Sequence, residues 1–379
     1  MRIGLLIYGS LDTLSGGYLY DRLLVDYLRR CGDRVEILSI PWRNYARHLG
    51  DNLSPALFRR LRDLKVDLLL QDELNHPSLA WLNARLKPTI RYPLVAIVHH
   101  LRSSEARQAW QNRLYRWVER HYLRSLDGFI FNSQTTQQMV MGLPSGRPEG
   151  IVAYPGGDRL GVQVSAEEIR ARAGQPGPLR LFFLGNLIPR KGLHTLLTAL
   201  EELQMRDWLL DVAGSQEVDP AYTRRIMSQA RAAGFEKRIS FLGPLQENSL
   251  VAHLRQAHLL VVPSSYEGFG IAYIEGMGLG LPAIASTAGA AHEIVTPGEN
   301  GFLVPPGDHQ ALAAYLSCLA QDRQRLAAMG LAARQRYLSH PTWEDSLRRI
   351  RAFLHNITKH QSPPADEEQG VRTDPSYPR

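Results

Sequence analysis

The sequence is poor in the residues and runs that mark secreted, membrane-spanning and metal-binding proteins. Its two cysteines, Cys31 and Cys318, lie in different halves of the chain, so a disulfide framework is excluded and a reducing compartment is favoured. No apolar run approaches the length needed to span a bilayer, and the segment from Met1 to Tyr8 is too short for a signal peptide. We therefore expect a cytoplasmic protein, which could attach only peripherally to the inner face of the membrane.

Two kinds of site are also missing. Neither a Cys/His cluster nor an Asp-x-Asp motif occurs, so metal chemistry has little support, and we expect no metal and no other cofactor. Gly16-Gly17 follows the first predicted strand, but the G-x-G-x-x-G fingerprint of dinucleotide binding is absent there. A nicotinamide-dependent oxidoreductase is therefore disfavoured.

The net charge of +7 is unevenly distributed. Residues 1–160 hold 22 Lys and Arg against 15 Asp and Glu, and the rest of the chain holds 22 of each kind. Nearly all of the excess is arginine, which binds planar anions through paired hydrogen bonds. The arginine-rich first half of the chain indicates an anionic acceptor or an anionic membrane as a partner. The alternative is an ordinary solvated surface. No nucleic-acid motif accompanies the arginines, so nucleic acid is not expected.

The pattern of apolar runs predicts an α/β protein. With 379 residues, of which 44% are apolar, the chain has room for two domains. Short apolar runs alternate with helical patterns, which is typical of parallel sheets covered on both faces. The strands predicted in the first half are Ile3–Tyr8, Val35–Ile40, Asp67–Gln71, Leu94–Val98, Gly128–Asn132 and Ile151–Tyr154. Those predicted in the second half are Leu179–Gly185, Trp208–Ala213, Ile239–Leu242, Leu259–Pro263 and Pro282–Ser286. We expect two doubly wound, Rossmann-like domains.

Two glutamates eight positions apart follow one of these strands. Glu267 and Glu275 flank the segment Gly268-Phe269-Gly270-Ile271. A helix that begins there offers free backbone N–H groups and a positive dipole end, and the glycines let a phosphate approach closely. Glu275 could accept hydrogen bonds from ribose hydroxyls and Glu267 from those of a second sugar, which suits a nucleotide sugar. The alternative is two solvated glutamates beside a turn.

The stretch from about Leu181 to Asp308 resembles the family-4 retaining glycosyltransferases, whose signature is Glu-x7-Glu. The flanking segments that also match are Phe-Leu-Gly-Asn-Leu-Ile-Pro-Arg-Lys-Gly (183–192), Gly-Leu-Pro-Ala-Ile-Ala-Ser (280–286), Glu-Ile-Val (293–295) and Asn-Gly-Phe-Leu-Val-Pro-Pro-Gly-Asp (300–308). The resemblance implies the two-domain GT-B fold and metal-independent, retaining transfer of a hexose. The donor would be a UDP- or GDP-sugar. The acceptor would carry a hydroxyl, as a glycolipid or a cell-surface or exopolysaccharide precursor does.

The resemblance also assigns roles to single residues. Arg190 and Lys191 match cations that hold the donor's phosphates, and His99 matches a histidine near the donor sugar and acceptor; the structural alternatives are a solvated basic helix start and a core histidine. The predicted catalytic residues are His99, Arg190, Lys191 and Glu267. The predicted donor-binding residues are Gly16, Gly17, Gly185, Gly268, Phe269, Gly270, Ile271 and Glu275.

Two positions depart from the family pattern. His100 stands where an aspartate is common, which puts any role of that carboxylate in doubt. Asn186 stands where many relatives have arginine, so one positive charge near the phosphates is missing.

The expected division of the chain follows from these assignments. Residues 1–164 form the acceptor-side domain, 165–178 a linker and 179–340 the nucleotide-sugar domain. Residues 341–358 form a helix that returns to the first domain, with an apolar stripe at Trp343, Leu347, Ile350 and Leu354. The tail, 359–379, has almost no aliphatic residues and is expected to be disordered.

A helical pattern after His100 has an unusual surface. Its apolar face carries Trp110, Leu114, Trp117, Val118 and His121, and its basic face Arg113, Arg116, Arg120 and Arg124. Such a helix suits an anionic lipid surface. The alternative is a helix packed on the sheet through its tryptophans, with solvated arginines.

The rival to an enzyme is a non-catalytic module. It would keep the nucleotide-sugar fold and bind an anionic partner or a membrane through its arginine-rich first half. The presence together of Glu267, Glu275, Arg190 and Lys191 favours the enzyme.

Overall fold

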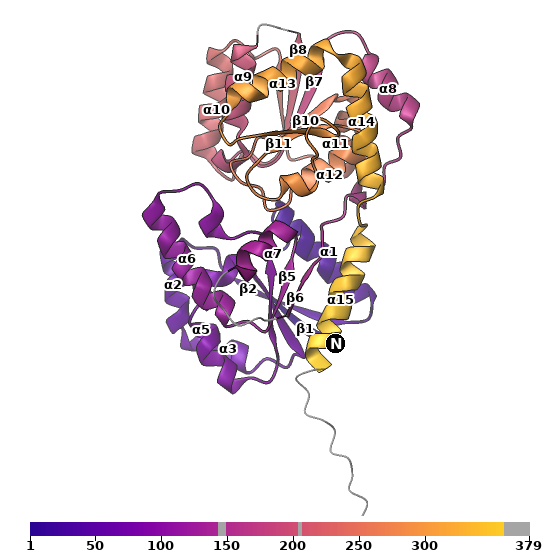
Figure 1. Cartoon of the computed structure of the whole chain (residues 1–379). Coiled ribbons are helices and arrows are strands. Elements are labelled where there is room, and N and C mark those ends of the chain that lie inside the picture. The colour runs from indigo at the N-terminus through magenta and orange to yellow at the C-terminus, as the bar shows by residue number, and fades with distance from the viewer. Residues whose placement is uncertain (143–148, 204–206, 360–379) are drawn as a thin grey trace, which may run out of the picture.

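The computed structural model describes residues 1–142, 149–203 and 207–359 and contains two six-stranded parallel sheets flanked by helices (Figure 1). The strand order is β2-β1-β3-β4-β5-β6 in the first sheet and β12-β11-β10-β7-β8-β9 in the second. The predicted fold class, two doubly wound α/β units, is confirmed. We call the units the first lobe and the second lobe.

The strands lie close to the predicted ranges. Those of the first sheet are β1 (Arg2–Tyr8), β2 (Arg34–Ile40), β3 (Leu68–Asp72), β4 (Leu94–Val98), β5 (Gly128–Phe131) and β6 (Glu149–Val152). Those of the second are β7 (Leu179–Leu184), β8 (Trp208–Ala213), β9 (Ile239–Gly243), β10 (Leu259–Val261), β11 (Ala283–Ser286) and β12 (Gly301–Val304). The central strands β3 and β4 are buried at every position, which explains their continuous apolar runs. The sequence pattern missed β12, a strand of four residues that begins with glycine.

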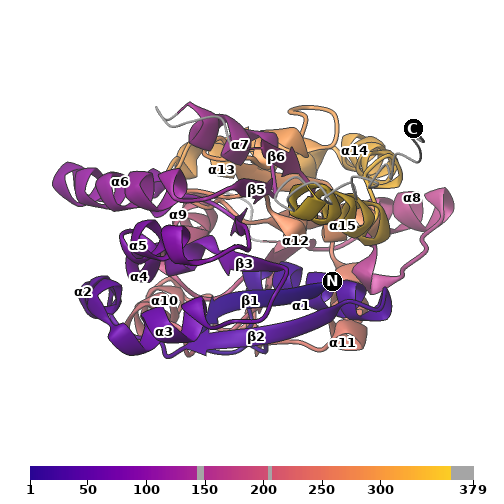
Figure 2. The same cartoon turned by 90° about the horizontal axis from the view of Figure 1, so that it is seen from below.

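Helices cover both faces of the first sheet (Figure 2) and flank the second sheet (Figure 1). They are α1 (Gly16–Arg30), α2 (Tyr45–Gly50), α3 (Pro55–Arg62), α4 (His76–Leu79), α5 (Leu82–Leu86), α6 (Ala109–Arg124), α7 (Gln134–Met141), α8 (Ala166–Gly174), α9 (Leu193–Glu202), α10 (Pro220–Ala232), α11 (Glu247–Gln256), α12 (Ile271–Gly278), α13 (His309–Gln321), α14 (Arg323–Leu338) and α15 (Trp343–Lys359). Within the stretch expected to be a linker, α8 packs against α14 of the second lobe.

The chain crosses between the lobes twice, and the two crossings are bonded to each other. Asp158 Oδ1 accepts a hydrogen bond of 2.8 Å from the backbone N–H of Trp343, and His340 Nε2 donates one of 2.8 Å to the carbonyl of Pro155. Burial lowers the pKa of His340 to about 4, so the ring is neutral at pH 7. We call this pair of crossings the hinge.

The last helix belongs to the first lobe, along which it runs in yellow in Figure 1. Trp343, Leu347, Ile350 and Leu354 are all buried, in one apolar cluster with residues of β1 and α1. The predicted tail lies outside the described residues from position 360 onward. Within the described part of the chain, no helix is long and apolar enough to cross a membrane.

Candidate functional site

Loops from the two lobes meet where the carboxyl ends of the sheets face each other. A Cβ atom at Gly268 would stand 2.4 Å from the carbonyl oxygen of His99 at the end of β4. One at Gly17, in the first turn of α1, would stand 3.1 Å from Cδ2 of the same histidine. Any larger residue would force His99 and these loops apart. The candidate site is therefore assembled from the start of α1, the end of β4 and the loop between β10 and α12.

Glu267 is held by a cation from the neighbouring loop. Lys191 Nζ donates a hydrogen bond of 2.7 Å to its Oε2, and Ser264 Oγ donates one of 3.1 Å to the same oxygen. The side chains of Glu267 and Lys191 are 11% and 17% exposed. Burial alone would raise the pKa of Glu267, but Lys191 and Arg190 hold it below its usual value. Glu267 is therefore an ionised hydrogen-bond acceptor.

Arg190 lies in the same loop, between β7 and α9. Its Nη1 donates a hydrogen bond of 3.0 Å to the carbonyl of Tyr266, and its own carbonyl accepts one of 2.7 Å from Ser265. Gly192 has a φ of +73°, and a Cβ there would stand 2.0 Å from the carbonyl oxygen of Pro263. This close approach brings both predicted cations to the loop that carries Glu267.

Glu275 is more buried than the sequence suggested. The helix α12 begins at Ile271, and Glu275, its fifth residue, is 4% exposed. Arg159 Nε donates a hydrogen bond of 2.9 Å to Oε1 of Glu275, its Nη2 forms an ion pair of 2.8 Å with the same oxygen, and its Nη1 pairs with Glu247 at 2.7 Å. Burial raises the pKa of Glu275 and Arg159 partly offsets that rise. The alternative of a solvated glutamate is therefore wrong for Glu275.

Arg159 is a residue that the sequence gave no reason to select, since no motif surrounds it. It lies in a short 3-10 turn, Asp158–Leu160, which is part of the hinge. The ion pair of 2.8 Å with Glu275 thus joins a hinge residue to the helix predicted to bind the nucleotide.

The remaining predicted donor residues of the second lobe divide into two groups. Gly270, with a φ of +99°, leads into α12, and Gly185 lies under the stem of Lys191, where a Cβ would stand 3.3 Å from Cδ. Phe269 is buried, and its ring packs 5.7 Å from the rings of both Tyr154 and His340. The side chain of Phe269 therefore contacts the hinge, which leaves its backbone as the part available to a ligand.

Two contacts join the lobes beside these glycines. A Cβ at Gly16 would stand 3.6 Å from Cδ1 of Ile271, so the predicted glycine pair and the start of α12 are neighbours. Asn186 donates a hydrogen bond of 2.7 Å to the carbonyl of Leu14 and accepts one of 3.1 Å from the N–H of Ser215. The residue that replaces the family's arginine is therefore a contact between the lobes.

His99 is buried beside a carboxylate. Its Nε2 lies 3.3 Å from Oδ1 of Asp21, which is on α1 and fully buried. No motif marks Asp21, although an aspartate on the apolar face of the helix, near Leu24 and Leu28, was a signal for it. His100 points elsewhere: its Nε2 is paired at 3.0 Å with Oε1 of Glu105.

A further contact between the lobes was also missed. Glu293 accepts hydrogen bonds from the backbone N–H groups of Gln134 and Thr135, at 3.0 and 2.7 Å, and from the hydroxyl of Tyr154 at 3.0 Å. It thus binds the first turn of α7 from the opposite lobe, where a carboxylate is favoured by the helix dipole. The contact keeps the two lobes together beside the site.

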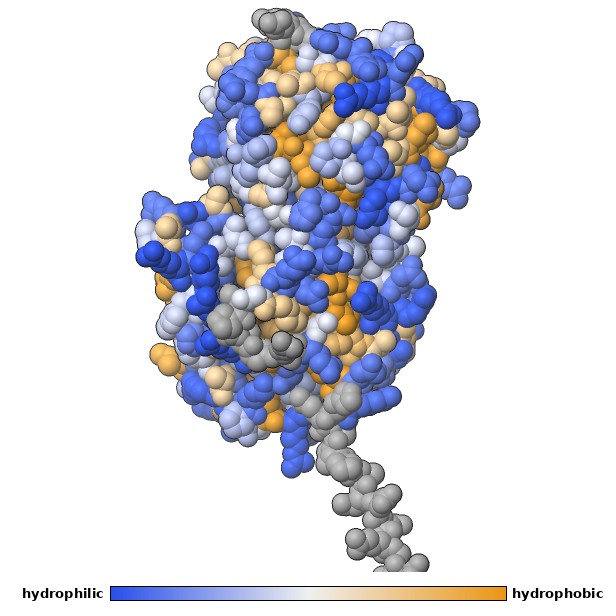
Figure 3. All heavy atoms as spheres, viewed as in Figure 1, coloured by the Kyte–Doolittle hydropathy of each residue, from blue (hydrophilic) through white to orange (hydrophobic). Residues whose placement is uncertain are grey.

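The helix α6 turns its tryptophans outward. Trp110, Leu114 and Trp117 are 62%, 41% and 50% exposed, whereas Val118 is buried. The alternative in which the tryptophans pack the helix onto the sheet is therefore wrong. Three of the four arginines are exposed, and Arg120 is half-buried. Hydrophilic side chains gather on the side of the first lobe where Figure 1 places α6 (Figure 3).

Among the residues that the structure describes, two buried groups of side chains have the composition of metal ligands. They are Asp21, Asp72 and His99, and Glu73, His76 and Glu119, with the ligand atoms of each group within 4.8 Å of one another. In the second group both ring nitrogens of His76 are engaged, one with the carbonyl of Glu73 at 3.0 Å and one with the hydroxyl of Tyr45 at 3.1 Å. That engagement leaves the ring no free nitrogen for an ion. The first group contains a predicted catalytic residue.

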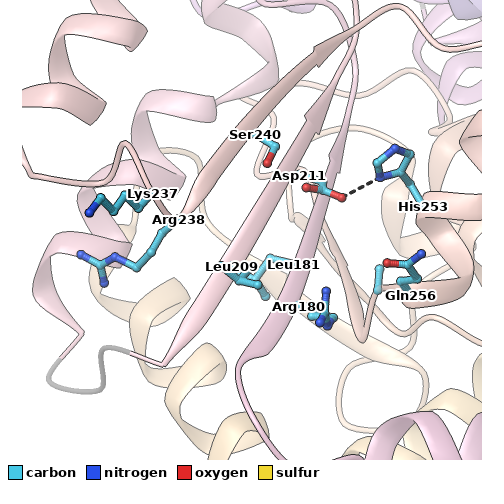
Figure 4. A pocket seen from close by; sticks show the side chains of 10 residues that line it. Arg180, Leu181, Leu209, Asp211, Lys237, Arg238, Ser240, His253 and Gln256 are labelled. Atoms are coloured by element: carbon cyan, nitrogen blue, oxygen red, sulfur yellow. Dashed lines mark hydrogen bonds and ion pairs between the residues drawn. The ribbon is translucent and has the colours of Figure 1, made fainter.

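A cavity of about 270 Å³ lies on the outer part of the second sheet (Figure 4). Arg180 and Asp211 line it, and Asp211 is paired at 2.8 Å with His253. Arg180 is the second residue of β7, so the cavity is near the amino ends of the strands, whereas the candidate site is at their carboxyl ends. The cavity is separate from the candidate site.

Comparisons with known proteins agree with this architecture. The model of group 1 glycosyl transferases matches residues 165–336, and the model of glycosyltransferase family 4 matches residues 19–157. The two matches together span most of the chain and cover both sides of the site. The chain belongs to the family-4 glycosyltransferases, as the motifs predicted.

Similar proteins are found both by sequence and among solved structures. The phosphatidyl-myo-inositol mannosyltransferase of Mycobacterium leprae is 28% identical over 89% of this chain and 93% of its own. The D-inositol 3-phosphate glycosyltransferase of Corynebacterium glutamicum is 28% identical over 72% and 68%. Among solved structures, a sucrose-phosphate synthase from Thermosynechococcus elongatus has a TM-score of 0.81 at 21% identity, covering 95% of this chain and 100% of its own. The Anabaena protein HepE, in complex with UDP and glucose, has a TM-score of 0.73 at 22% identity, covering 94% and 99%. These structures confirm the GT-B fold.

Proposed function

We propose that this glycosyltransferase moves a hexose from a UDP- or GDP-sugar to a hydroxyl of a lipid-linked or other cell-surface glycan precursor, with retention of configuration. The observation that carries the proposal is the meeting of Glu267, Lys191 and Arg190 with the end of β4 at Gly268. Paired carboxylate and cations at a helix start suit a donor that has both sugar hydroxyls and a diphosphate.

The donor would lie along the loop between β10 and α12. Glu267 would accept hydrogen bonds from the sugar. Glu275 would accept them from the ribose once Arg159 shares or releases the Glu275 carboxylate. Arg190, Lys191 and the N–H groups at the start of α12 would stabilise the negative charge that develops on the leaving diphosphate. The protein thus offers its own cations and backbone dipoles to stabilise a negative charge that many enzymes stabilise with a metal. We therefore propose a metal-independent transfer.

His99 would orient the donor sugar. Its backbone carbonyl is in contact with Gly268, so the histidine and Glu267 approach one bound sugar from opposite lobes. Closure of the lobes around the donor would exclude water and favour transfer over hydrolysis.

The acceptor side is proposed to work at a membrane. The exposed tryptophans and arginines of α6 suit an interface with anionic lipid, since aromatic rings enter the headgroup region and arginines attract its charge. The mycobacterial relative named for phosphatidyl-myo-inositol supports a lipid-linked acceptor. Peripheral attachment on the cytoplasmic face would bring the site to such an acceptor.

A donor panel tests the proposal. Release of UDP or GDP should be measured with several nucleotide sugars, with anionic lipid vesicles that carry phosphatidylinositol as the acceptor source. We expect one donor to exceed the others by at least about tenfold, a difference of about 1.4 kcal/mol in transition-state stabilisation. The absence of binding and turnover with every nucleotide sugar would favour the non-catalytic module. The anomeric configuration of the product, determined by NMR, would test retention.

A further inference from the structure

Two carboxylates and one histidine are buried together beneath the candidate site. Asp21 on α1 and Asp72 at the end of β3 are both 0% exposed, and His99 is 8% exposed. Neither oxygen of Asp21 has a hydrogen-bond partner among the described residues, and neither does Oδ2 of Asp72. Buried polar atoms of this kind ordinarily have partners, so the cluster requires an explanation.

Charge balance gives that explanation. Two ionised carboxylates in one buried place repel each other and lose their hydration, so at least one positive charge or proton must compensate them. The imidazole of His99 can carry that positive charge, since its Nε2 lies 3.3 Å from Oδ1 of Asp21. The contact has the distance of an ion pair, without the alignment of a hydrogen bond.

We propose that Asp21 is a positioning residue that keeps His99 as an imidazolium, so that the ring acts in the transfer reaction as a hydrogen-bond donor and never as a base. The inference rests on the proposed function for the use of His99 at the donor sugar, but the charge state of the cluster is independent of it. An imidazolium carries a proton on both nitrogens, so it can donate to a sugar or phosphate oxygen while it faces Asp21. The leaving phosphate would then have to take the acceptor's proton.

The groups packed around His99 support this assignment. Burial by itself lowers the pKa of His99, but its carboxylate neighbours, Asp21 foremost, raise it to about 9. Burial and the charge of Asp21 raise the pKa of Asp72 well above its usual value. The other titratable neighbours are Tyr18 and Tyr20 of α1, whose pKa values burial raises, so both are neutral. At pH 7 His99 is therefore protonated, and burial beside Asp21 favours the neutral form of Asp72.

Glycine at position 17 fits the same picture. Its Cα faces the edge of the His99 ring that carries Nε2, and a Cβ there would stand 3.4 Å from that nitrogen. The first turn of α1 thus covers the ring next to Asp21, four residues later on the same helix. One helix both closes the site over His99 and supplies its counter-charge.

The first experiment measures the charge of His99 directly. Long-range proton–nitrogen NMR spectra of protein with isotopically labelled histidine distinguish imidazolium from neutral tautomers, and His99→Gln identifies the signal. We expect the wild-type ring to stay protonated through neutral pH. Asp21→Asn, which keeps the shape and removes the charge, should lower its pKa by at least about one unit.

Asp72→Asn is the matched control, because the same substitution is made at an equally buried position that is already neutral. It should move the pKa of His99 by much less than Asp21→Asn. A neutral His99 in the wild type, or an equal effect of the two variants, would overturn the proposal. So would displacement of the His99 proton by added zinc or manganese at stoichiometric concentration, which would make the cluster a metal site.

The second experiment tests the use of the proton. If the imidazolium is needed, the alkaline limb of the kcat profile should shift to lower pH in Asp21→Asn, while the KM for the donor changes less. An alkaline limb that belongs to Lys191 would not move. An unshifted limb in a variant whose NMR shows a lowered pKa would refute the catalytic part, and NMR results as expected without any turnover would refute only the proposed function.

Discussion

Glu267 and Glu275 in the second lobe each have a cation at 2.7 to 2.8 Å, whereas Asp21 and Asp72 in the first lobe share a single histidine. The carboxylates of the second lobe are balanced by Lys191 and by Arg159 of the hinge, whose ordinary pKa values lie far above neutral, although burial lowers the pKa of Lys191. The first lobe balances its buried charge with groups that can lose or share a proton. The comparison suggests that the second lobe is built to hold a charged ligand and the first to control where protons lie.

Removal of Lys191 should have the largest effect, because it would leave a buried carboxylate unpaired in the second lobe. Lys191→Met should lower the free energy of unfolding by about 3–5 kcal/mol and abolish turnover. The double variant Lys191→Met/Glu267→Gln should recover much of that stability but no turnover. Urea unfolding curves of both variants provide the measurement. Equal stability of the single and the double variant would contradict the pairing.

The surface of α6 should make the first lobe, and not the second, responsible for binding to anionic vesicles. Replacing Arg113, Arg116 and Arg124 with Gln should remove about 1 kcal/mol of attraction to anionic vesicles per arginine, and salt should screen the wild-type binding.

The matched control is the same substitution of three exposed arginines on α10 of the second lobe, Arg224, Arg225 and Arg231, which should leave sedimentation with vesicles unchanged. Wild-type protein that ignores anionic vesicles at low salt would refute the membrane contact. Reduced acceptor use without any vesicle binding would point to a soluble anionic acceptor.

Donor affinity should fall when the nucleotide end of the site is altered. Arg190→Ala and Glu275→Ala should each weaken calorimetric binding of the donor by at least about tenfold, or about 1.4 kcal/mol. Because Glu275 is buried against Arg159, its replacement should also lower stability, and Arg159→Gln separates the two effects. Unchanged donor affinity in both alanine variants would refute the donor-site assignment.

The protons of the first lobe should appear in the pH dependence of stability. The pKa of Asp72 is raised in the folded protein, so its contribution is full below the usual pKa of an aspartate and is lost as pH rises toward the folded value. Asp72→Asn should therefore gain stability relative to the wild type as pH rises from about 5 to about 8, by up to about 1.4 kcal/mol for each pH unit over which the folded carboxyl stays protonated. Unfolding by urea at both pH values tests the sign, and a gain that shrinks as pH rises would contradict the neutral Asp72.

Chelation should have the smallest effect. With Arg190, Lys191 and the start of α12 available for the diphosphate, EDTA should leave turnover unchanged. Loss of activity that a divalent ion restores would show that the transfer depends on a metal.

The sequence predicted most of the fold because parallel strands and helices have periodic signatures. It also selected Glu267, Arg190 and Lys191. These residues lie in two short segments, each of which can be recognised from its own local motif. It could not select Arg159, which meets Glu275 across 116 positions, or Glu293, which meets Gln134 across 159. Such contacts depend on how the lobes and the hinge dock, and local periodicity carries no information about docking.

Asp21 lies between these cases. Its place on the apolar face of a helix was visible in the sequence, but its partners were not, because Asp72 and His99 come from two other strands. The burial of a charged residue can be inferred from a helical pattern. The group that compensates its charge can be identified only when the strands are placed side by side.

The return of α15 to the first lobe has a consequence for synthesis. Trp343, Ile350 and Leu354 belong to the same apolar cluster as β1 and α1, which are made first. On the ribosome, the lobe that emerges first therefore keeps one apolar face bare while the second lobe, whose strands and helices follow one another along the chain, can already close. The first lobe is synthesised first but completes its fold last, when α15 packs onto it. The nascent chain is most exposed to aggregation in the interval between its synthesis and that packing.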